Sequence, residues 1–221
     1  MKKTAFTLAE VLITLGIIGI VAAMTIPTLI QKNFEKQTVA KLRETQSILS
    51  QAMRMAEDEY GDPSGWGLTG NNSESAELIA KNLKPFLKLA ADCGIKDTKY
   101  ACVSKNQYKR LNGENHGDYA ISRTDCYKIA LLNGSSIWWR TSEPSEDRYI
   151  TFWIDVNGKY QPNMYGKDLF VFVYEKHSSS IKPLGSNKKD DYWQNSCTKN
   201  STGFGCAYYV LQNQNMSYLH K

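Results

Sequence analysis

The sequence predicts an α+β fold in which a long N-terminal helix packs against an antiparallel sheet of about four strands. Three observations support this prediction. The 20 residues of Val11–Ile30 carry no charge, residues 31–60 keep a helical spacing of apolar side chains, and the chain after Tyr127 alternates with a period of two. With 221 residues and 42% hydrophobic content, the chain can form one globular domain and an accessory segment.

The apolar run Val11–Ile30 is long enough to cross a membrane. At about 1.5 Å per residue, a helix of this length matches the hydrocarbon core of a bilayer. A secretory signal peptide would have a shorter apolar centre followed by a small-residue cleavage site, whereas Ala22–Met24 lies inside the run. Lys2 and Lys3 precede the run, which predicts a cytoplasmic N-terminus with the remaining chain on the far side of the membrane.

One carboxylate, Glu10, is the only charged side chain between Lys3 and Lys32. An ionisable group in a spanning helix is costly, so a partner is expected; the alternative is a glutamate that reaches to the membrane interface. The surrounding stretch, "AFTLAEVLITLGIIGIVAAMTIPTLI", resembles the N-terminal signal of type IV prepilins and type II secretion pseudopilins. That signal has a short basic leader, a small residue at the cleavage point, Phe-Thr-Leu-x-Glu and an apolar helix.

The resemblance implies that prepilin peptidase removes Met1–Ala5, and that the new α-amino group of Phe6 is methylated. Glu10 becomes the fifth mature residue, and in this family it pairs with that amine on a neighbouring subunit. Opposite charges attract more strongly in low dielectric, and either one left alone there is penalised. Pro27 lies where such pilins commonly carry a proline that kinks the helix. The family usually has Gly before the cleaved bond, where this chain has Ala5.

The helical spacing continues beyond the membrane run and ends at Gly61–Gly67, which contains the helix-terminating residues Gly and Pro. The predicted domain organisation is a leader at 1–5, a transmembrane and assembly helix at 6–30, an amphipathic helix at 31–60 and a globular pilin-like head at 61–221. The apolar stripe of the amphipathic helix comprises Val39, Leu42, Leu49, Met53, Ala56 and Tyr60.

The head sequence begins with a helical pattern and then changes to strands. Ser75–Ala90 reads as a helix bent at Pro85, and Tyr127–Thr141 reads as a hairpin with a type I′ turn at Asn133–Gly134. β-branched and aromatic residues predict two further strands, Tyr149–Gly158 and Asp168–Glu175.

The five cysteines predict two disulfides. Cys93 and Cys102 are nine residues apart, as are Cys197 and Cys206, and no accompanying histidine cluster supports zinc. A translocated head would lie in an oxidising compartment, where these two pairs would each close a short loop worth roughly 2–3 kcal/mol. Cys126 then remains as a buried free thiol, although pairing with another cysteine stays open. The Cys197–Cys206 loop resembles the C-terminal disulfide loop of pilins.

The loop Asp155–Asp168 is a candidate calcium site, since some pseudopilins hold calcium in a loop of the sheet region. Its spacing departs from an EF-hand, because Lys159 stands where a third oxygen ligand would be. The alternative, which we favour, is that Asn157–Gly158 turns the chain while Pro162 and Gly166 shape the loop. The candidate ligands are Asp155, Asn157, Asn163 and Asp168.

Enzyme and nucleic-acid functions find little support. His116, His177 and His220 lie in polar stretches, and the sequence holds no HExxH, Walker or GxSxG motif, so no catalytic residue is expected. The net charge of +5 is a weak basic bias without a cluster along the sequence, which disfavours nucleic acid as a partner.

The sequence therefore predicts a structural subunit, a minor pilin or pseudopilin of a type IV pilus or type II secretion pseudopilus. Its expected partners are further copies and related pilins, prepilin peptidase, the inner membrane and assembly platform proteins. The head would be periplasmic before entering the fibre. Two alternatives remain: a membrane-anchored binding or sensor protein that does not polymerise, and a DNA-binding competence pilin.

Overall fold

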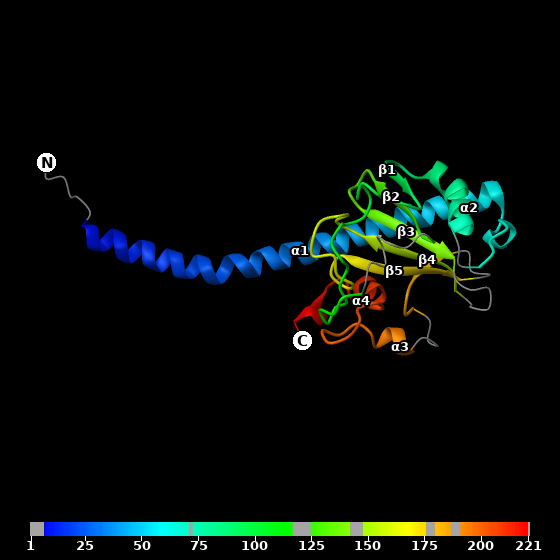
Figure 1. Ribbon diagram of the computed structural model, residues 1–221. Coiled ribbons are helices and arrows are strands. Elements are labelled where there is room, and N and C mark those ends of the chain that lie inside the picture. The colour runs from blue at the N-terminus through cyan, green and yellow to red at the C-terminus, as the bar shows by residue number, and fades with distance from the viewer. Residues whose placement is uncertain are drawn as a thin grey trace. The chain divides into compact units, whose positions relative to one another are not determined.

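The computed structural model describes residues 7–70, 73–116, 125–141, 148–175, 180–186 and 191–220 (Figure 1). The chain forms two units, Met1–Gln37 and Thr38–Lys221, which we call the N-terminal unit and the head. The predicted fold class is confirmed, since a long helix precedes an antiparallel sheet.

The long helix α1 runs from Leu8 to Tyr60 and contributes to both units. Its eight buried residues all belong to the head, where they recur at the three- and four-residue steps that the sequence indicated. The helix ends where Gly61, at φ +77°, donates its amide to the carbonyl of Glu57 at 2.8 Å. The buried residues are Thr38, Val39, Leu42, Thr45, Leu49, Ala52, Met53 and Ala56.

The sheet has six described strands rather than the expected four, in the order β1-β2-β3-β4-β5-β6, and every neighbouring pair is antiparallel. Each strand pairs with the next along the chain, so the sheet is a simple meander. The strands are β1 (Leu89–Gly94), β2 (Tyr127–Leu131), β3 (Ser136–Thr141), β4 (Arg148–Asp155), β5 (Leu169–Glu175) and β6 (Ile181–Pro183).

The helix expected at Ser75–Ala90 is shorter than predicted. Helix α2 covers Ser73–Leu83, and a 3₁₀ turn, η2 (Lys84–Phe86), follows it. Pro85 has no amide hydrogen to continue the α-helical ladder, which explains the stop. The last part of the expected helix instead begins strand β1 at Leu89, which pairs with β2.

The β2–β3 connection also differs from the expected type I′ turn, which requires positive φ at both central residues. Gly134 has φ +86°, whereas Asn133 is not among the residues with positive φ. The amide of Gly134 donates to the carbonyl of Leu131 at 3.0 Å, and the amide of Leu131 donates to that of Ser135 at 2.8 Å. The connection is therefore a three-residue loop in which Gly134 alone takes the left-handed conformation.

Both faces of the sheet are buried. Side chains along β5 alternate between two apolar clusters, with Phe170 on the inner face towards α1 and α2 and Val171 on the outer face. The outer face is covered by the segment around Val103 and Tyr108 and by residues near the C-terminus. Largest among the fully buried side chains are Trp138 on the outer face and Trp139 on the inner face.

The remaining described elements are short. Helix α4 (Cys206–Asn213) contributes Ala207 and Val210 to the inner core. The others are η1 (Pro63–Gly65), α3 (Asp191–Gln194) and η3 (Ser217–Leu219).

Candidate functional site

The first turn of α1 holds its single carboxylate by reciprocal hydrogen bonds. The amide and hydroxyl of Thr7 both donate to Glu10 Oε2 at 2.9 Å, and the Glu10 amide donates to Thr7 Oγ1 at 3.3 Å. This is a capping box, which satisfies helix N–H groups that have no carbonyl partner within the helix. The Thr-x-x-Glu spacing in the sequence is the signal of this cap. Ala5 and Phe6 lie outside the described residues.

The apolar segment that follows, Leu8–Ile30, exposes all of its large hydrophobic side chains. Its large hydrophobic residues range from 44% exposed at Val11 to 79% at Leu8. The helix is long and apolar enough in this part to cross a membrane. Because burial inside the subunit does not stabilise these side chains, lipid or another chain must cover them.

Pro27 lies inside α1, as the sequence indicated. Its ring nitrogen cannot donate to the carbonyl one turn earlier. Two nearby threonine hydroxyls donate back to main-chain carbonyls: Thr25 to that of Val21 at 2.9 Å, and Thr28 to that of Met24 at 3.5 Å. These bonds satisfy the hydroxyls within the helix itself, as a bilayer would require.

In the head, the loop from β4 to β5 brings two buried carboxylates together. Asp155 and Asp168 are both 0% exposed. The Tyr108 hydroxyl donates to Asp155 Oδ2 at 2.8 Å, while the amides of Asn163 and Met164 donate to the two oxygens of Asp168 at 2.7 and 2.6 Å. The carboxylates thus anchor the loop from within.

Burial makes negative charge on these two groups unfavourable. It raises the pKa of Asp155 well above its usual value, and the charge of Asp168 raises it further. Burial also raises the pKa of Asp168 to about 6, although amides of the loop oppose the shift. Burial and the adjacent Asp155 raise the pKa of Tyr108. A cation beside the two carboxylates would relieve this penalty.

Two amide side chains near the carboxylates have buried oxygens with no hydrogen-bond donor. Asn163 is 1% exposed, and its Nδ2 donates to Ser104 Oγ at 3.1 Å while its Oδ1 has no donor. The Oδ1 of Asn157 is likewise buried without a donor, and its Nδ2 donates to the carbonyl of Gln161 at 2.9 Å. The four residues singled out for calcium therefore supply buried oxygens from one loop, of the hard type that calcium prefers.

The loop geometry also agrees with the structural alternative. Gly158 and Gly166 have φ +68° and +75°, conformations that side chains other than glycine rarely adopt. A Cβ on Gly166 would lie 2.9 Å from Cys206 Sγ, so the loop packs closely on the C-terminal region. Turn formation and oxygen ligation are compatible in the same loop.

The structure contains the two disulfides that the spacing predicted, Cys93–Cys102 and Cys197–Cys206. Cys126 is buried and not disulfide-bonded, and it directly precedes β2. The carboxylate of Asp97 lies within 4.8 Å of Cys93 and Cys102, but their sulfurs are already bonded to each other and offer no thiolate to a metal.

Sequence reasoning missed a buried lysine next to Cys126. Lys128 is 0% exposed, and its ammonium donates to the carbonyls of Ile95 at 2.7 Å and Cys126 at 3.0 Å. Burial lowers the pKa of Lys128. The ammonium thereby ties the disulfide loop to the outer face of the sheet. The sequence signal was a lysine inside a strand with alternating apolar residues. Such a lysine is more simply interpreted as facing solvent than as buried.

The described histidines do not form a catalytic group. His116 packs edge-on against the rings of Tyr165 and Phe204, with centroid distances of 5.0 and 5.1 Å. Burial, together with Arg110, lowers the pKa of His116. His220 lies near the C-terminus, and His177 lies outside the described residues. The role of His116 in the described part of the head is therefore packing.

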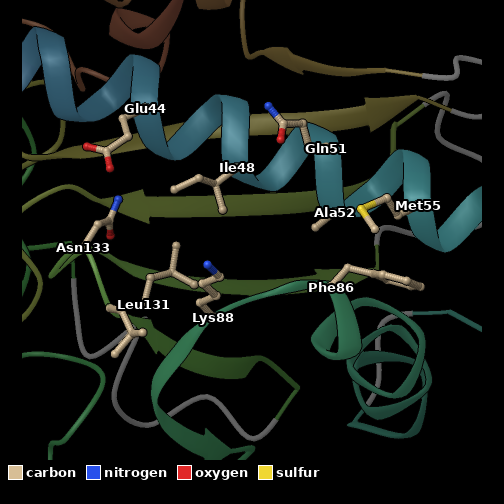
Figure 2. Close-up of a pocket in the computed structure, with 10 residues that line it drawn as sticks. Glu44, Ile48, Gln51, Ala52, Met55, Phe86, Lys88, Leu131 and Asn133 are labelled. Carbon is tan, nitrogen blue, oxygen red and sulfur yellow. The ribbon is translucent and has the colours of Figure 1, made fainter.

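A groove of about 400 Å³ follows α1 along the β1–β2 side of the head (Figure 2). Glu44 and Asn133 lie at one end, and Met55 and Phe86 lie at the other. Its remaining lining is mainly apolar, with Lys88 reaching over it. This composition suits contact with another molecule rather than proton transfer or nucleophilic attack.

Comparison with known families gives two matches that adjoin at Pro27. The prokaryotic N-terminal methylation motif matches residues 1–26, and a family of unknown function (DUF6613) matches residues 28–218. No curated protein matches the chain. No solved structure matches it either. The first match identifies the N-terminal segment as a type IV prepilin-like signal.

Proposed function

Because the chain belongs to DUF6613, a family of unknown function, and begins with the N-terminal methylation motif, we propose that it is a structural subunit of a fibre. It is a type IV pilin- or pseudopilin-like protein. The proposed role is that of a minor pilin or pseudopilin in a type IV pilus or type II secretion pseudopilus. Prepilin peptidase would cleave after Ala5, Phe6 would be methylated, and the head would be periplasmic before assembly.

The observation that carries this proposal is the start of α1. Its one carboxylate, Glu10, lies on a segment whose large apolar side chains are all exposed. Thr7 satisfies one carboxylate oxygen, Oε2, and within the described residues the other is left for a cation. The N-terminal amine of a neighbouring copy would supply that cation, and adjacent apolar helices would cover one another. In low dielectric, pairing then lowers the free energy of assembly only in the register in which the carboxylate meets the amine.

Replacing Glu10 with Ala tests the proposal in cells that express the full chain. We expect the subunit to be cleaved and membrane-bound but absent from sheared fibres, because the amine of its neighbour loses its partner. Thr7→Val is the matched control, since it removes the cap hydroxyl but keeps the carboxylate. Fibres at the wild-type level from Glu10→Ala would contradict the pairing.

Fibre entry of the wild type, together with a DNA-binding assay, distinguishes the two alternatives. A binding or sensor protein that keeps the anchor without polymerising would be absent from fibres in wild-type form as well. A DNA-binding competence pilin would enter fibres and, in addition, would bind DNA with a steep salt dependence in a gel-shift assay on the full chain.

We also propose that the β4–β5 loop holds calcium as a structural ion. The specific support is the pair of buried carboxylates together with the donor-less oxygens of Asn157 and Asn163. Asp155 and Asp168 would supply negative charge, and the two amides would supply neutral oxygens. The ion would neutralise the repulsion between the carboxylates and stabilise the loop; it has no catalytic part.

Thermal unfolding of the detergent-solubilised full chain, in calcium and in EGTA, tests this site. At a calcium concentration 100 times the Kd we expect stabilisation of about 2.7 kcal/mol. Asn157→Ala removes one neutral ligand and should weaken the calcium response, whereas Lys159→Ala in the same loop should leave it intact. Identical wild-type unfolding in calcium and EGTA would rule out the site.

A further inference from the structure

The loops at the end of the head where α1 enters are joined to one another. Asn133 Nδ2 donates to Thr45 Oγ1 at 3.2 Å, which fixes the β2–β3 connection beside α1. Ser135 Oγ donates to the carbonyl of Val156 at 3.2 Å, which brings the β4–β5 loop to the same end. These contacts place residues far apart in the sequence on one end of the head (Figure 1).

Two more segments join this end through the main chain. The amide of Tyr165 in the β4–β5 loop donates to the carbonyl of Lys109 at 2.9 Å. The amide of Leu111 donates to the carbonyl of Thr202 at 3.1 Å, which attaches the Cys197–Cys206 loop. Four segments of the head therefore share one surface.

This surface, which we call the basic end, gathers lysines and arginines that are scattered along the sequence. Among the described residues of these four segments, the acidic side chains outside the buried pair are Glu44 and Glu114, and Glu114 pairs with Arg110 at 3.1 Å. Among the residues that the structure describes, Lys109 and Lys159 form no ion pair. The members of the basic end are Lys41, Arg43, Lys109, Arg110, Lys159, Lys167 and Lys199.

At the opposite end of the head, the last turn of α1 and the first turns of α2 carry mainly acidic side chains. The last turn of α1 contains Glu57, Asp58 and Glu59 and no basic residue. A helix C-terminus carries partial negative charge, so carboxylates there are unfavourable and cations are stabilising. Arg54 lies one turn earlier, and α2 begins close by (Figure 1). This acidic end comprises Glu57, Asp58, Glu59, Asp62, Glu74 and Glu77.

From this separation of charge we propose that heads dock end to end, with the basic end of one copy against the acidic end of the next. The inference rests on the proposed function, because it names the contact between heads within a fibre. Both surfaces are present on every copy, so the contact is head-to-tail and repeats into an open helical assembly rather than a closed dimer. Cations from the neighbour would also offset the unfavourable carboxylates at the end of α1.

Charge reversal in the full chain, expressed in cells and followed by the yield of sheared fibres, tests the docking. The basic-end variant is Lys109→Glu with Lys159→Glu, and the acidic-end variant is Asp58→Lys with Glu59→Lys. Each should reduce fibre yield about tenfold or more, because like charges then oppose each other. The two changes combined restore opposite charge across the contact and should restore fibres.

The control reverses two exposed lysines that are members of neither charged set, Lys96→Glu with Lys99→Glu, and should leave fibre yield unchanged. Thermal unfolding of each variant at the wild-type temperature establishes that the head is folded. Wild-type fibres together with unaffected reversal variants would overturn the docking and leave the proposed function standing. Loss in the basic-end variant alone would also overturn it, since another polyanion would then be the partner. A wild-type chain that forms no fibre would overturn both.

Discussion

The N-terminal unit exposes its large apolar side chains, whereas the head buries most of its own in its core. In the N-terminal unit, large side chains from Leu8 to Ile30 are at least 44% exposed, and the described polar groups bond within one helical turn. In the head, both faces of the sheet are covered, and contacts such as Thr45 with Ser135 join residues 90 positions apart. One unit depends on its surroundings, and the other is stabilised from within.

This difference predicts where a substitution will be felt. Changes in the head should alter its unfolding, whereas changes in the apolar segment should alter membrane insertion or assembly and leave head unfolding untouched. Tryptophan fluorescence separates the two, because all five tryptophans lie in the head. The following measurements use the full chain in detergent.

The largest expected effect comes from truncating a core side chain of the head. Phe152 is 0% exposed on the inner face of the sheet, and Phe152→Ala should cost about 3–5 kcal/mol of head stability because a cavity replaces the ring. Ile18→Ala, at a position 63% exposed in the N-terminal unit, should leave the fluorescence-detected transition unchanged. Equal losses for both variants would contradict the comparison.

The disulfides give the next largest effect, and both lie in the head. Replacing Cys197 and Cys206 together with Ala should cost roughly 2–3 kcal/mol, because the unfolded chain regains the entropy of a short loop. Denaturant unfolding under oxidising conditions measures this loss. Adding a reductant should destabilise the wild type by more than this, because it also opens Cys93–Cys102, and should have less effect on the variant. Cys126→Ala is the control, because it removes the thiol that is not disulfide-bonded and keeps both disulfides.

Glycine-to-alanine substitutions test the same difference between the head and the N-terminal unit. Gly203 has φ +82°, and a Cβ there would lie 2.7 Å from the carbonyl oxygen of Tyr165, so Gly203→Ala should cost about 2 kcal/mol or more. Gly16 lies in α1 with nothing within 4 Å of the added Cβ, and Gly16→Ala should leave head unfolding unchanged. If the Gly203→Ala head were as stable as the wild type, the backbone around Tyr165 would have to move away from the added Cβ at little cost.

The smallest effect concerns pH. Burial and Arg110 lower the pKa of folded His116 below its ordinary 6.5, so the unfolded chain binds more protons between the two pKa values. Stability contributed by His116 should therefore fall as pH decreases below 6.5, by at most about 1.4 kcal/mol per pH unit for one proton. The raised pKa of Asp168 acts in the opposite direction. The test is thus the pH dependence of the difference between His116→Gln and the wild type, and a flat difference would refute the assignment.

The sequence predicted the elements whose signals are local. Apolar spacing located α1, alternation located β2 to β5, and equal cysteine spacing indicated the two disulfides. Strand β1 was missed because "LAADCG" lacks β-branched and aromatic residues, and its conformation depends on pairing with β2. The three-residue strand β6 is too short to show alternation.

For the candidate sites, the sequence located single residues better than it located their surroundings. Glu10 and the oxygen-rich loop were identified from motif and composition. Tyr108, which donates to Asp155, and Lys128, which is covered by the 95–103 loop, were not, because long-range packing alone brings them there. The charge separation of the head was also invisible, since its lysines come from four separate segments.

The reciprocal bonding of Thr7 and Glu10 has a consequence for the energetics of a subunit waiting in the bilayer. A carboxylate that already accepts two bonds within its own turn is a tolerable resident of the membrane before any neighbour arrives. In the proposed fibre, the amine of a neighbour would bind the other carboxylate oxygen, so assembly would add a partner rather than rescue a stranded ion. On this proposal, monomers held in this way persist in the membrane until they assemble.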